Sequence, residues 1–162
     1  MPSSRPSSAK GGVVLASLRL LVFGALLGAT AACTSGATPV AATVTVSGAW
    51  VRVATTTAAP TAAYLVIANP GGQADALLGV STPAASAVEI HQTSTDMNGM
   101  TGMAAIPRLE VPAGGTVQLA PGGFHLMVTG LKAPLTAGGT IELDLVFEHA
   151  GRVVVQADVR AG

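Results

Sequence analysis

The chain of 162 residues contains a single cysteine, Cys33. An intrachain disulfide is therefore excluded, so folding depends on packing alone. A metal site in the part of the chain after Cys33 cannot use a thiolate ligand. Charged residues make up only 10% of the sequence, against roughly 25% in an average soluble domain. The sequence also has no internal repeat and no helical periodicity long enough to predict a helix, which favours a fold built from strands.

The few charges are unevenly distributed. Three of the eight basic residues precede Cys33, namely Arg5, Lys10 and Arg19, and none of the eight acidic residues does. The portion from Cys33 onward therefore carries five basic and eight acidic groups, a net charge of −3. Nucleic-acid binding needs clustered Lys and Arg, and this portion has no such cluster, so that function is excluded.

The first 33 residues have the pattern of a secretory signal, with basic residues, an apolar run at 20–27 and small residues at 28–32. The run is too short to cross a bilayer, which takes ~20 apolar residues. Thr30-Ala31-Ala32-Cys33 resembles a bacterial lipobox, although Thr30 stands where Leu is usual. We predict a lipoprotein signal peptide at 1–32, a lipidated Cys33 and a tether at 33–44. The alternative is ordinary cleavage of the signal peptide without lipidation, with Cys33 lost or left as an unpaired thiol. In either case we expect the protein to be exported, to the periplasm or the outer face of the cytoplasmic membrane.

Residues 45–162 have the alternation of strands. In Thr140–Glu148 only Val146 breaks the alternation, and in Arg152–Arg160 four apolar residues share one face. Gly- and Pro-rich turns separate the segments. Short strands at this spacing predict an all-β, two-sheet antiparallel sandwich. The other predicted strands are Thr45–Val53, Ala63–Asn69, Ala76–Ser81, Ala87–Gln92, Gly102–Leu109, Thr116–Ala120 and Gly123–Leu131.

Histidine and methionine are concentrated in one stretch of this domain. After Cys33 the chain has four Met and three His, and six of these seven lie between positions 91 and 127. Successive strand side chains point to opposite faces. Leu126 and Val128 belong to the core face, so His125 and Met127 point together to the other face. By the same alternation Ile90 faces the core and His91 faces away from it.

Two imidazoles with one or two thioethers make a soft, neutral ligand set that suits Cu(I). Zinc sites normally draw on Cys, His and carboxylates. Methionine is also a common core filler, but Met127 does not sit with the apolar set. The residues alone leave two interpretations open. One is a Cu(I) site, and the other is a pair of exposed histidines beside a flexible loop that contains Met97 and Met100.

Several stretches resemble the PCuAC family of periplasmic copper chaperones. The similarity spans about 45–160, and the segment from Pro112 to Met127 is the most specific part. It implies a cupredoxin-like (Ig-like) Greek-key β-sandwich. It also implies a chaperone, not an enzyme, that delivers Cu(I) to a cytochrome c oxidase subunit or a Sco-type protein. The matching stretches are Ala49-Trp50-Val51-Arg52, Ala63-Tyr64-Leu65, Val88-Glu89-Ile90-His91, Pro112-Ala113-Gly114-Gly115, Pro121-Gly122-Gly123-Phe124-His125-Leu126-Met127 and Phe147-Glu148-His149-Ala150-Gly151.

The family signature implies that His91, Met103, His125 and Met127 hold one Cu(I) per chain. Met103 is selected because twenty-one residues separate it from His125, as in the family. Eleven residues separate His91 from Met103, whereas the family has ten, so an extra residue is expected in the Asp96–Gly102 hairpin. Met100 is therefore an auxiliary candidate. We expect a monomer attached to the membrane by its lipid anchor.

Other residues have less specific interpretations. We expect His149 to be exposed in a turn, and Trp50 and Arg52 to serve packing or a partner surface. Glu89 shares the face of His91 and could orient that imidazole, although a solvated acid is the simpler expectation. An electron-transfer centre of the blue-copper type needs a cysteine ligand, which this domain lacks. The remaining alternative function is a structural or interaction lipoprotein without metal.

Overall fold

The computed structural model describes residues 44–162, so the predicted signal peptide, Cys33 and nearly all of the tether lie outside the described residues. Within this range the chain forms ten β-strands and no helix, which confirms the all-β class. No helix capable of crossing a membrane is found in it. The strands are β1 (Thr45–Arg52), β2 (Thr61–Ala68), β3 (Asp75–Ser81), β4 (Ala85–Thr95), β5 (Thr101–Ala105), β6 (Leu109–Val111), β7 (Thr116–Leu119), β8 (Phe124–Leu131), β9 (Thr140–Phe147) and β10 (Arg152–Arg160).

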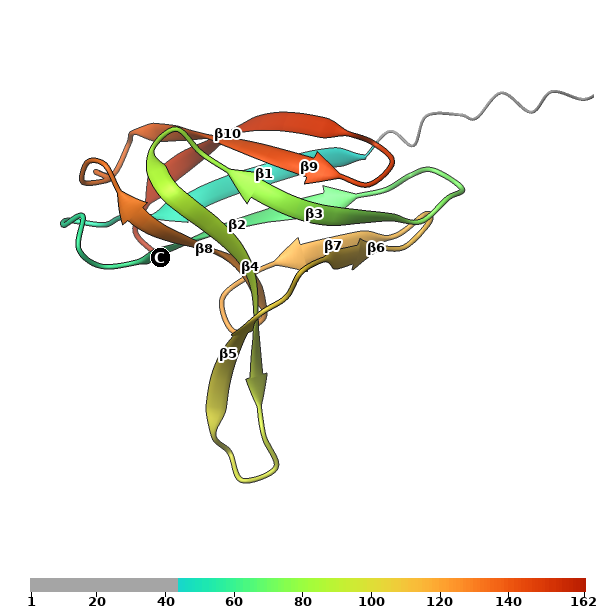
Figure 1. Ribbon diagram of the computed structural model, residues 1–162, viewed down its shortest axis with the longest axis horizontal. Helices are drawn as coiled ribbons and strands as arrows, with labels where there is room; N and C mark the ends of the chain where they lie inside the picture. Colours follow the sequence, from blue (N-terminus) through green and yellow to red (C-terminus); the bar gives the residue numbers. More distant parts are fainter. Residues whose placement is uncertain (1–43) are drawn as a thin grey trace, which may run out of the picture. The chain divides into compact units, whose positions relative to one another are not determined.

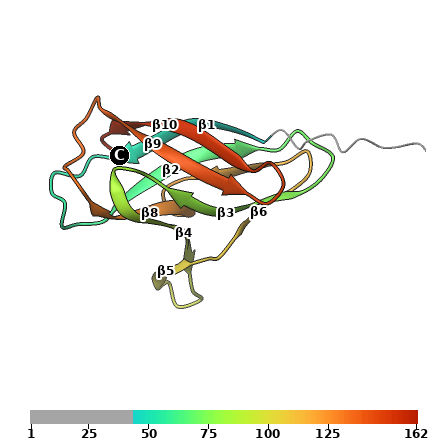
Figure 2. The ribbon, with the colours of Figure 1, turned by 45° about the horizontal axis from the view of Figure 1, so that its top comes forward.

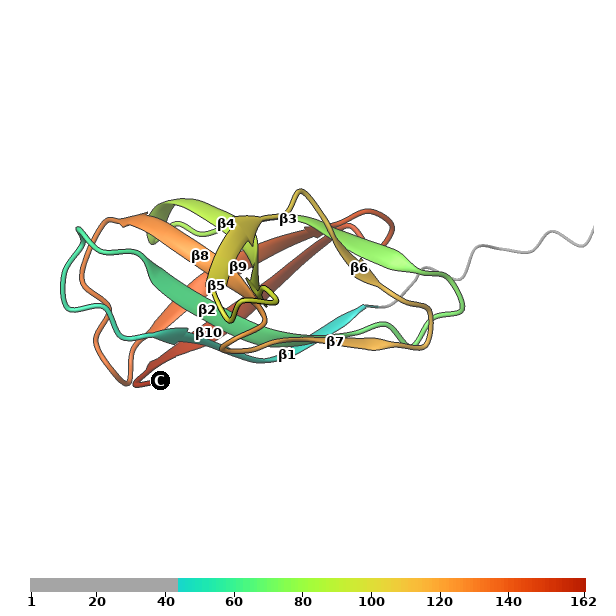
Figure 3. The same cartoon turned by 90° about the horizontal axis from the view of Figure 1, so that it is seen from below.

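Hydrogen bonds join all ten strands into one sheet that closes on itself. The closed path runs β4–β8–β2–β1–β10–β9–β3 and returns to β4 through the pairing of β3 with β4. β7 lies beside β2 and β8, β6 lies beside β3, and β5 lies beside β4 alone. In Figure 3, β1 and β7 run along one side of the closed sheet and β3 and β6 along the other.

The predicted two-sheet antiparallel sandwich was wrong in two details, because the strands form one closed sheet and two of the pairings are parallel. β1 pairs with β10 in parallel, and β7 meets β8 in parallel. The eleven residues of β4 pair with β3 at Val88 and with β8 from Ala85 to Gln92. β4 thus joins β3 to β8, and the sheet is continuous across these three strands.

Alternating apolar residues place the core inside the closed sheet. Leu126 and Val128 of β8 are fully buried, as are Leu143 and Leu145 of β9. Ile90 of β4 joins the same apolar cluster. Burying a Leu or Val side chain is worth roughly 1.5–3 kcal/mol, so these positions determine which face of each strand turns inward. The face of β4 and β8 that carries His91 and His125 is consequently the outer one.

Two predicted strands differ from those observed by more than two residues at one end. The segment Gly102–Leu109 is not one strand, because β5 ends at Ala105 and β6 begins at Leu109. Pro107 lies in the break, and proline has no N–H to donate to a ladder. The predicted strand Ala87–Gln92 extends from Ala85 to Thr95, and its last three residues lie beyond the ladder with β8 and pair with β5. The β4–β5 hairpin therefore projects from the rest of the fold, as Figures 1 and 2 show.

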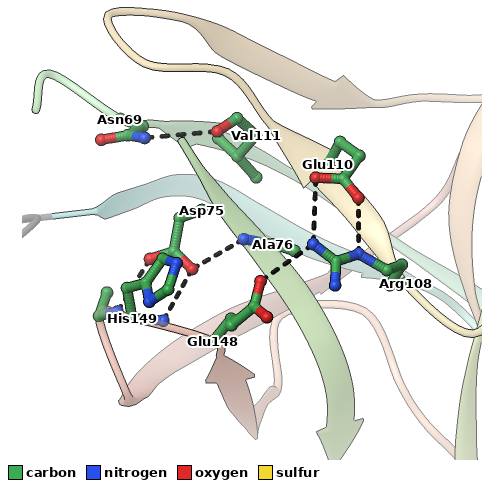
Figure 4. A network of polar contacts seen from close by, with 9 residues as sticks. Asn69, Asp75, Ala76, Arg108, Glu110, Val111, Glu148 and His149 are labelled. Atoms are coloured by element: carbon green, nitrogen blue, oxygen red, sulfur yellow. Dashed lines mark hydrogen bonds and ion pairs between the residues drawn. The ribbon is translucent and has the colours of Figure 1, made fainter. Parts of the chain in front are cut away.

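A buried carboxylate ties β3 to the turn between β9 and β10 (Figure 4). Asp75 is 1% exposed and accepts hydrogen bonds from the backbone N–H groups of Ala76, His149 and Ala150 at 2.7–2.9 Å. Burial alone would raise the pKa of Asp75. The three N–H donors and the nearby His149 outweigh it, and the pKa of Asp75 is lowered. The ionised form therefore stabilises the fold.

Replacing Asp75 by asparagine should lower the free energy of unfolding by about 2 kcal/mol at pH 7, because an amide NH₂ would then face a backbone donor. The folded-state pKa is below the ordinary 3.8. The carboxylate's contribution is therefore present above that value and lost as the pH falls through the lowered one. Urea unfolding of both proteins at pH 7 and in acid measures the difference. An Asp75→Asn penalty that stayed constant with pH would contradict this assignment.

Candidate metal centre

The pairing of β4 with β8 places His91 directly opposite His125. Both side chains lie on the outer face of the sheet, with Ile90 and Leu126 turned into the core. The two imidazole centroids are 5.6 Å apart and the rings are tilted by 52°. The predicted convergence of the two histidines on one side of the fold is thus observed.

Strand register also places Met127 and Met103 on this face. Met127 lies opposite Glu89, two residues from His91 along β4, and Met103 lies opposite Thr93, two residues from His91 in the other direction. Diagonal neighbours of this kind have Cβ atoms roughly 7–8 Å apart, within reach of long side chains. The two thioethers therefore flank the histidine pair from its two sides. Met100 precedes β5 and belongs to the hairpin turn.

The ring of His125 is buried and held in one orientation. His125 is 5% exposed, although it does not face the apolar core. Its Nδ1 lies 3.2 Å from the Gly123 carbonyl oxygen, which also accepts the backbone N–H of Thr93. A carbonyl can only accept, so Nδ1 carries the hydrogen and Nε2 of the neutral ring has the free lone pair.

The ring of His91 has the complementary arrangement. Its Nε2 lies 3.3 Å from Glu89 Oε2, and a carboxylate can only accept, so Nε2 is the protonated nitrogen. Nδ1 is buried and has no hydrogen-bond partner among residues 44–162. Leaving a buried polar atom unpaired costs roughly 1–3 kcal/mol. A ligand bound at Nδ1 would remove this cost.

The two rings thus present one unprotonated nitrogen each, Nδ1 of His91 and Nε2 of His125. Metal-binding histidines typically donate their other ring N–H to a carboxylate or a backbone carbonyl, and these two donate to Glu89 and Gly123. Residues 44–162 contain no group of three or more His, Cys, Asp or Glu side chains able to hold a metal ion. The further donors on this face are the thioethers of Met103 and Met127, which suit a soft monovalent ion.

The structure decides two of the sequence interpretations. The histidines are not a freely exposed pair, because His125 is buried and the His91 side chain is 15% exposed. Glu89 was expected to be a solvated acid. It is 59% exposed and also bonds His91, so the orienting role is present too. Sequence reasoning missed the Gly123 carbonyl, because a backbone acceptor leaves no signal in residue type.

Residues outside the site lie as expected. His149 is exposed in the turn after β9. The Trp50 ring stacks on Tyr64 with centroids 4.5 Å apart, and the Arg160 guanidinium lies 4.8 Å from the centre of the Trp50 ring. These contacts engage Trp50 in packing on the β1 side. Met97 and Met100 are exposed on the hairpin.

Comparison with known proteins gives related sequences and folds. Residues 44–159 match the family described as "Putative lipoprotein LpqE-like". The chain is 38% identical over 117 residues to "Putative lipoprotein Lxx21020" of Leifsonia xyli subsp. xyli, a match that covers 72% of this chain and 69% of the relative.

Solved structures give matches over a similar share of the chain. CuI-DR1885 from Deinococcus radiodurans is 34% identical, with a TM-score of 0.56, and covers 72% of this chain and 79% of its own. The copper-bound PCuAC domain from PmoF2 has a TM-score of 0.62 and covers 74% of this chain and 93% of its own. At 24% identity that second similarity indicates the fold alone.

Proposed function

This chain belongs to the LpqE-like lipoprotein family, and we propose that it binds one Cu(I) ion outside the cytoplasm and delivers it to a copper-accepting protein. The resemblance to PCuAC domains is confirmed by the solved structures that it matches. DR1885, which is 34% identical, was solved in a CuI form. That relative supports copper as the cargo of this chain.

One observation carries the proposal: the buried Nδ1 of His91 has no hydrogen-bond partner among the described residues and lies in a ring whose centroid is 5.6 Å from that of His125. We assign Nδ1 of His91, Nε2 of His125 and the sulfur atoms of Met103 and Met127 as the ligands. Glu89 and Gly123 orient the imidazoles through the opposite ring nitrogens. The ligands would be neutral, which favours a monovalent soft ion over divalent zinc.

Delivery is favoured over storage by the uneven exposure of this ligand set. His125 is buried, whereas Met103 is 61% exposed on β5. An incoming ligand from a partner can therefore displace the Met103 thioether first, while the imidazoles still hold the ion. The steps would be ligand exchanges at constant oxidation state, without a catalysed reaction. We propose a cytochrome c oxidase subunit or a Sco-type thiol protein as the recipient.

The architecture around this site fits the proposed cupredoxin-like Greek-key class, with residues 45–162 as the copper-binding domain. The parallel pairing of β1 with β10 and the closed path of strands support that assignment. We propose further that residues 1–32 are removed and that Cys33, followed by the 33–44 tether, anchors the domain at the outer face of the cytoplasmic membrane. The lipoprotein description of the family supports this anchor.

The anchor has a direct test. Intact-mass analysis of the membrane fraction should show a chain that begins at Cys33 and carries a diacylglycerol group. The Cys33→Ala variant should leave the membrane fraction, because Cys33 is the single cysteine to which the lipid could be attached. A soluble wild-type product cut at another residue would remove the anchor from the proposal and leave export intact.

The function is tested by anaerobic Cu(I) titration of the purified protein, followed by native mass spectrometry and competition with a calibrated Cu(I) chelator. We expect one tightly held Cu(I) per chain and much weaker Zn(II) binding, since thioether is a poor zinc ligand. His149→Ala is the matched control, because His149 is exposed and outside the site. Zinc binding as tight as copper binding would count against this site. If neither Cu(I) nor Zn(II) bound, the alternative function, a structural or interaction lipoprotein without metal, would be favoured.

A further inference from the structure

The β4–β5 hairpin carries methionines that the fold does not use. Met97, Met100 and Met103 lie within seven residues and are 104%, 72% and 61% exposed. The other large apolar side chains described as exposed are Leu78, Val146 and Val154, which are each less than half exposed and lie on separate strands. Packing therefore gives no account of three thioethers here.

The surroundings of these methionines are polar or small. From Thr93 to Ala105 the hairpin contains no other large apolar residue. Beyond Thr93 the two strands of the hairpin pair with each other, and the Thr95 and Thr101 hydroxyls lie 3.1 Å apart across it. A hairpin without an apolar face is marginally stable alone. Its turn must therefore be held by other contacts.

Asp96 supplies those contacts. Its Oδ1 accepts the backbone N–H groups of Asn98 and Met100 at 2.9 and 2.8 Å. The Asp96 N–H donates to the Met100 carbonyl, and Gly99 has the left-handed φ of +81° that the turn requires. The turn is thus closed by backbone and carboxylate groups alone. The Met97 and Met100 side chains at the tip are left exposed.

The three thioethers also form a series that leads to the histidine pair. Met103 shares the outer face with His91 and His125 through the β4–β5 register. Met100 lies three residues farther out, roughly 10 Å of extended chain, and Met97 lies on the other side of the turn. A soft ion would meet these thioethers before reaching the imidazoles.

We propose that Met97, Met100 and Met103 form a second, thioether-only Cu(I) site at the end of the hairpin, through which the ion enters and leaves the histidine pair. The exchange role rests on the proposed function, but the binding does not. Thioethers are neutral soft donors that suit Cu(I). Transfer replaces one copper–ligand bond by another, with no change in the oxidation state of copper and no proton moved.

The binding is tested in a His91→Ala/His125→Asn background, where the first site is removed. Protein with ¹³C-labelled methionine methyl groups is titrated anaerobically with Cu(I), and with Ag(I) as a redox-inert replacement. The methyl signals of Met97, Met100 and Met103 should move together while that of Met127 stays. Adding Met97→Leu/Met100→Leu should abolish the movement of Met103. Stationary Met97 and Met100 signals, or equal movement of all four, would overturn the site.

The exchange role is tested in the chain with both histidines intact. Met97→Leu/Met100→Leu should slow extraction of the bound ion by a Cu(I) chelator about fivefold or more. Its equilibrium affinity should stay the same, since leucine preserves volume and apolarity without ligating. Extraction at the wild-type rate would overturn the exchange role. Wild-type Cu(I) affinity no higher than that of the His91→Ala/His125→Asn chain would instead refute the proposed function, and the thioether result in the histidine-free background would stand by itself.

Discussion

Replacing His125 by asparagine should lower the affinity for Cu(I) at least about 1,000-fold, or roughly 4 kcal/mol, with the fold retained. The asparagine amide nitrogen can take the place of Nδ1 and donate to the Gly123 carbonyl. The substitution therefore removes Nε2, the proposed ligand atom, and keeps the hydrogen bond that orients the side chain. Chelator competition under anaerobic conditions measures the affinity.

The fold should tolerate this change because His125 is not part of the apolar core. The Gly123 carbonyl also keeps the Thr93 N–H as a donor. We expect a loss of about 1–2 kcal/mol in the free energy of unfolding, from the smaller buried side chain. Circular dichroism and urea unfolding of the metal-free protein check this point. Wild-type affinity in His125→Asn would refute the site, and so would wild-type affinity in the companion variant His91→Ala.

The two faces of the site strands could be predicted from sequence because hydrophobic alternation has a period of two. Phe124, Leu126 and Val128 alternate with His125 and Met127, and a slip of one residue would have buried the ligands and exposed the core. The structure buries Leu126 and Val128 completely and keeps Met127 on the outer face. The strand Arg152–Arg160 was predicted with its observed bounds for the same reason.

A hairpin at Asp96–Gly102 was expected, but the bounds of its two strands could not be predicted from alternation. Thr93, Ser94 and Thr95 are all polar, because both faces of the projecting end meet water and no alternation is imposed on them. The end of β4 was therefore missed. The break at Pro107 was missed because Gly102–Leu109 mixes small and apolar residues without a clear period. Pairing of the residues beyond it with β3 then formed the separate strand β6.

The orientation of the histidines also lies beyond sequence reasoning. The tautomer of His125 depends on the Gly123 carbonyl, and that of His91 on the Glu89 carboxylate. The burial of His125 depends on long-range packing around β8, including its pairing with a strand more than thirty residues earlier in the chain. Residue types define the donor set, whereas register and backbone acceptors select which ring nitrogen is available.

The choice between Met103 and Met100 is the point at which the spacing of the chain departs from the family pattern. Eleven residues separate His91 from Met103, one more than the resemblance implies, and we expect the additional one in the Asp96–Gly102 hairpin. The strand register gives the two candidate ligands different positions relative to the histidines. Met103 lies on β5 opposite Thr93, on the histidine face. Met100 donates its backbone N–H to Asp96 in the turn and is farther from both imidazoles along the hairpin.

Met103→Leu should therefore lower the affinity for the first Cu(I) roughly 100-fold, or about 2.7 kcal/mol, and Met100→Leu by less than about threefold. Both residues are exposed, so each variant should unfold within about 0.5 kcal/mol of wild type. The pair is matched in chemistry, and only position relative to the histidines distinguishes its members. Chelator competition with each variant measures the two affinities. A larger loss for Met100→Leu than for Met103→Leu would transfer the fourth ligand to the turn, and equal small losses would leave Cu(I) held by His91, His125 and Met127 alone.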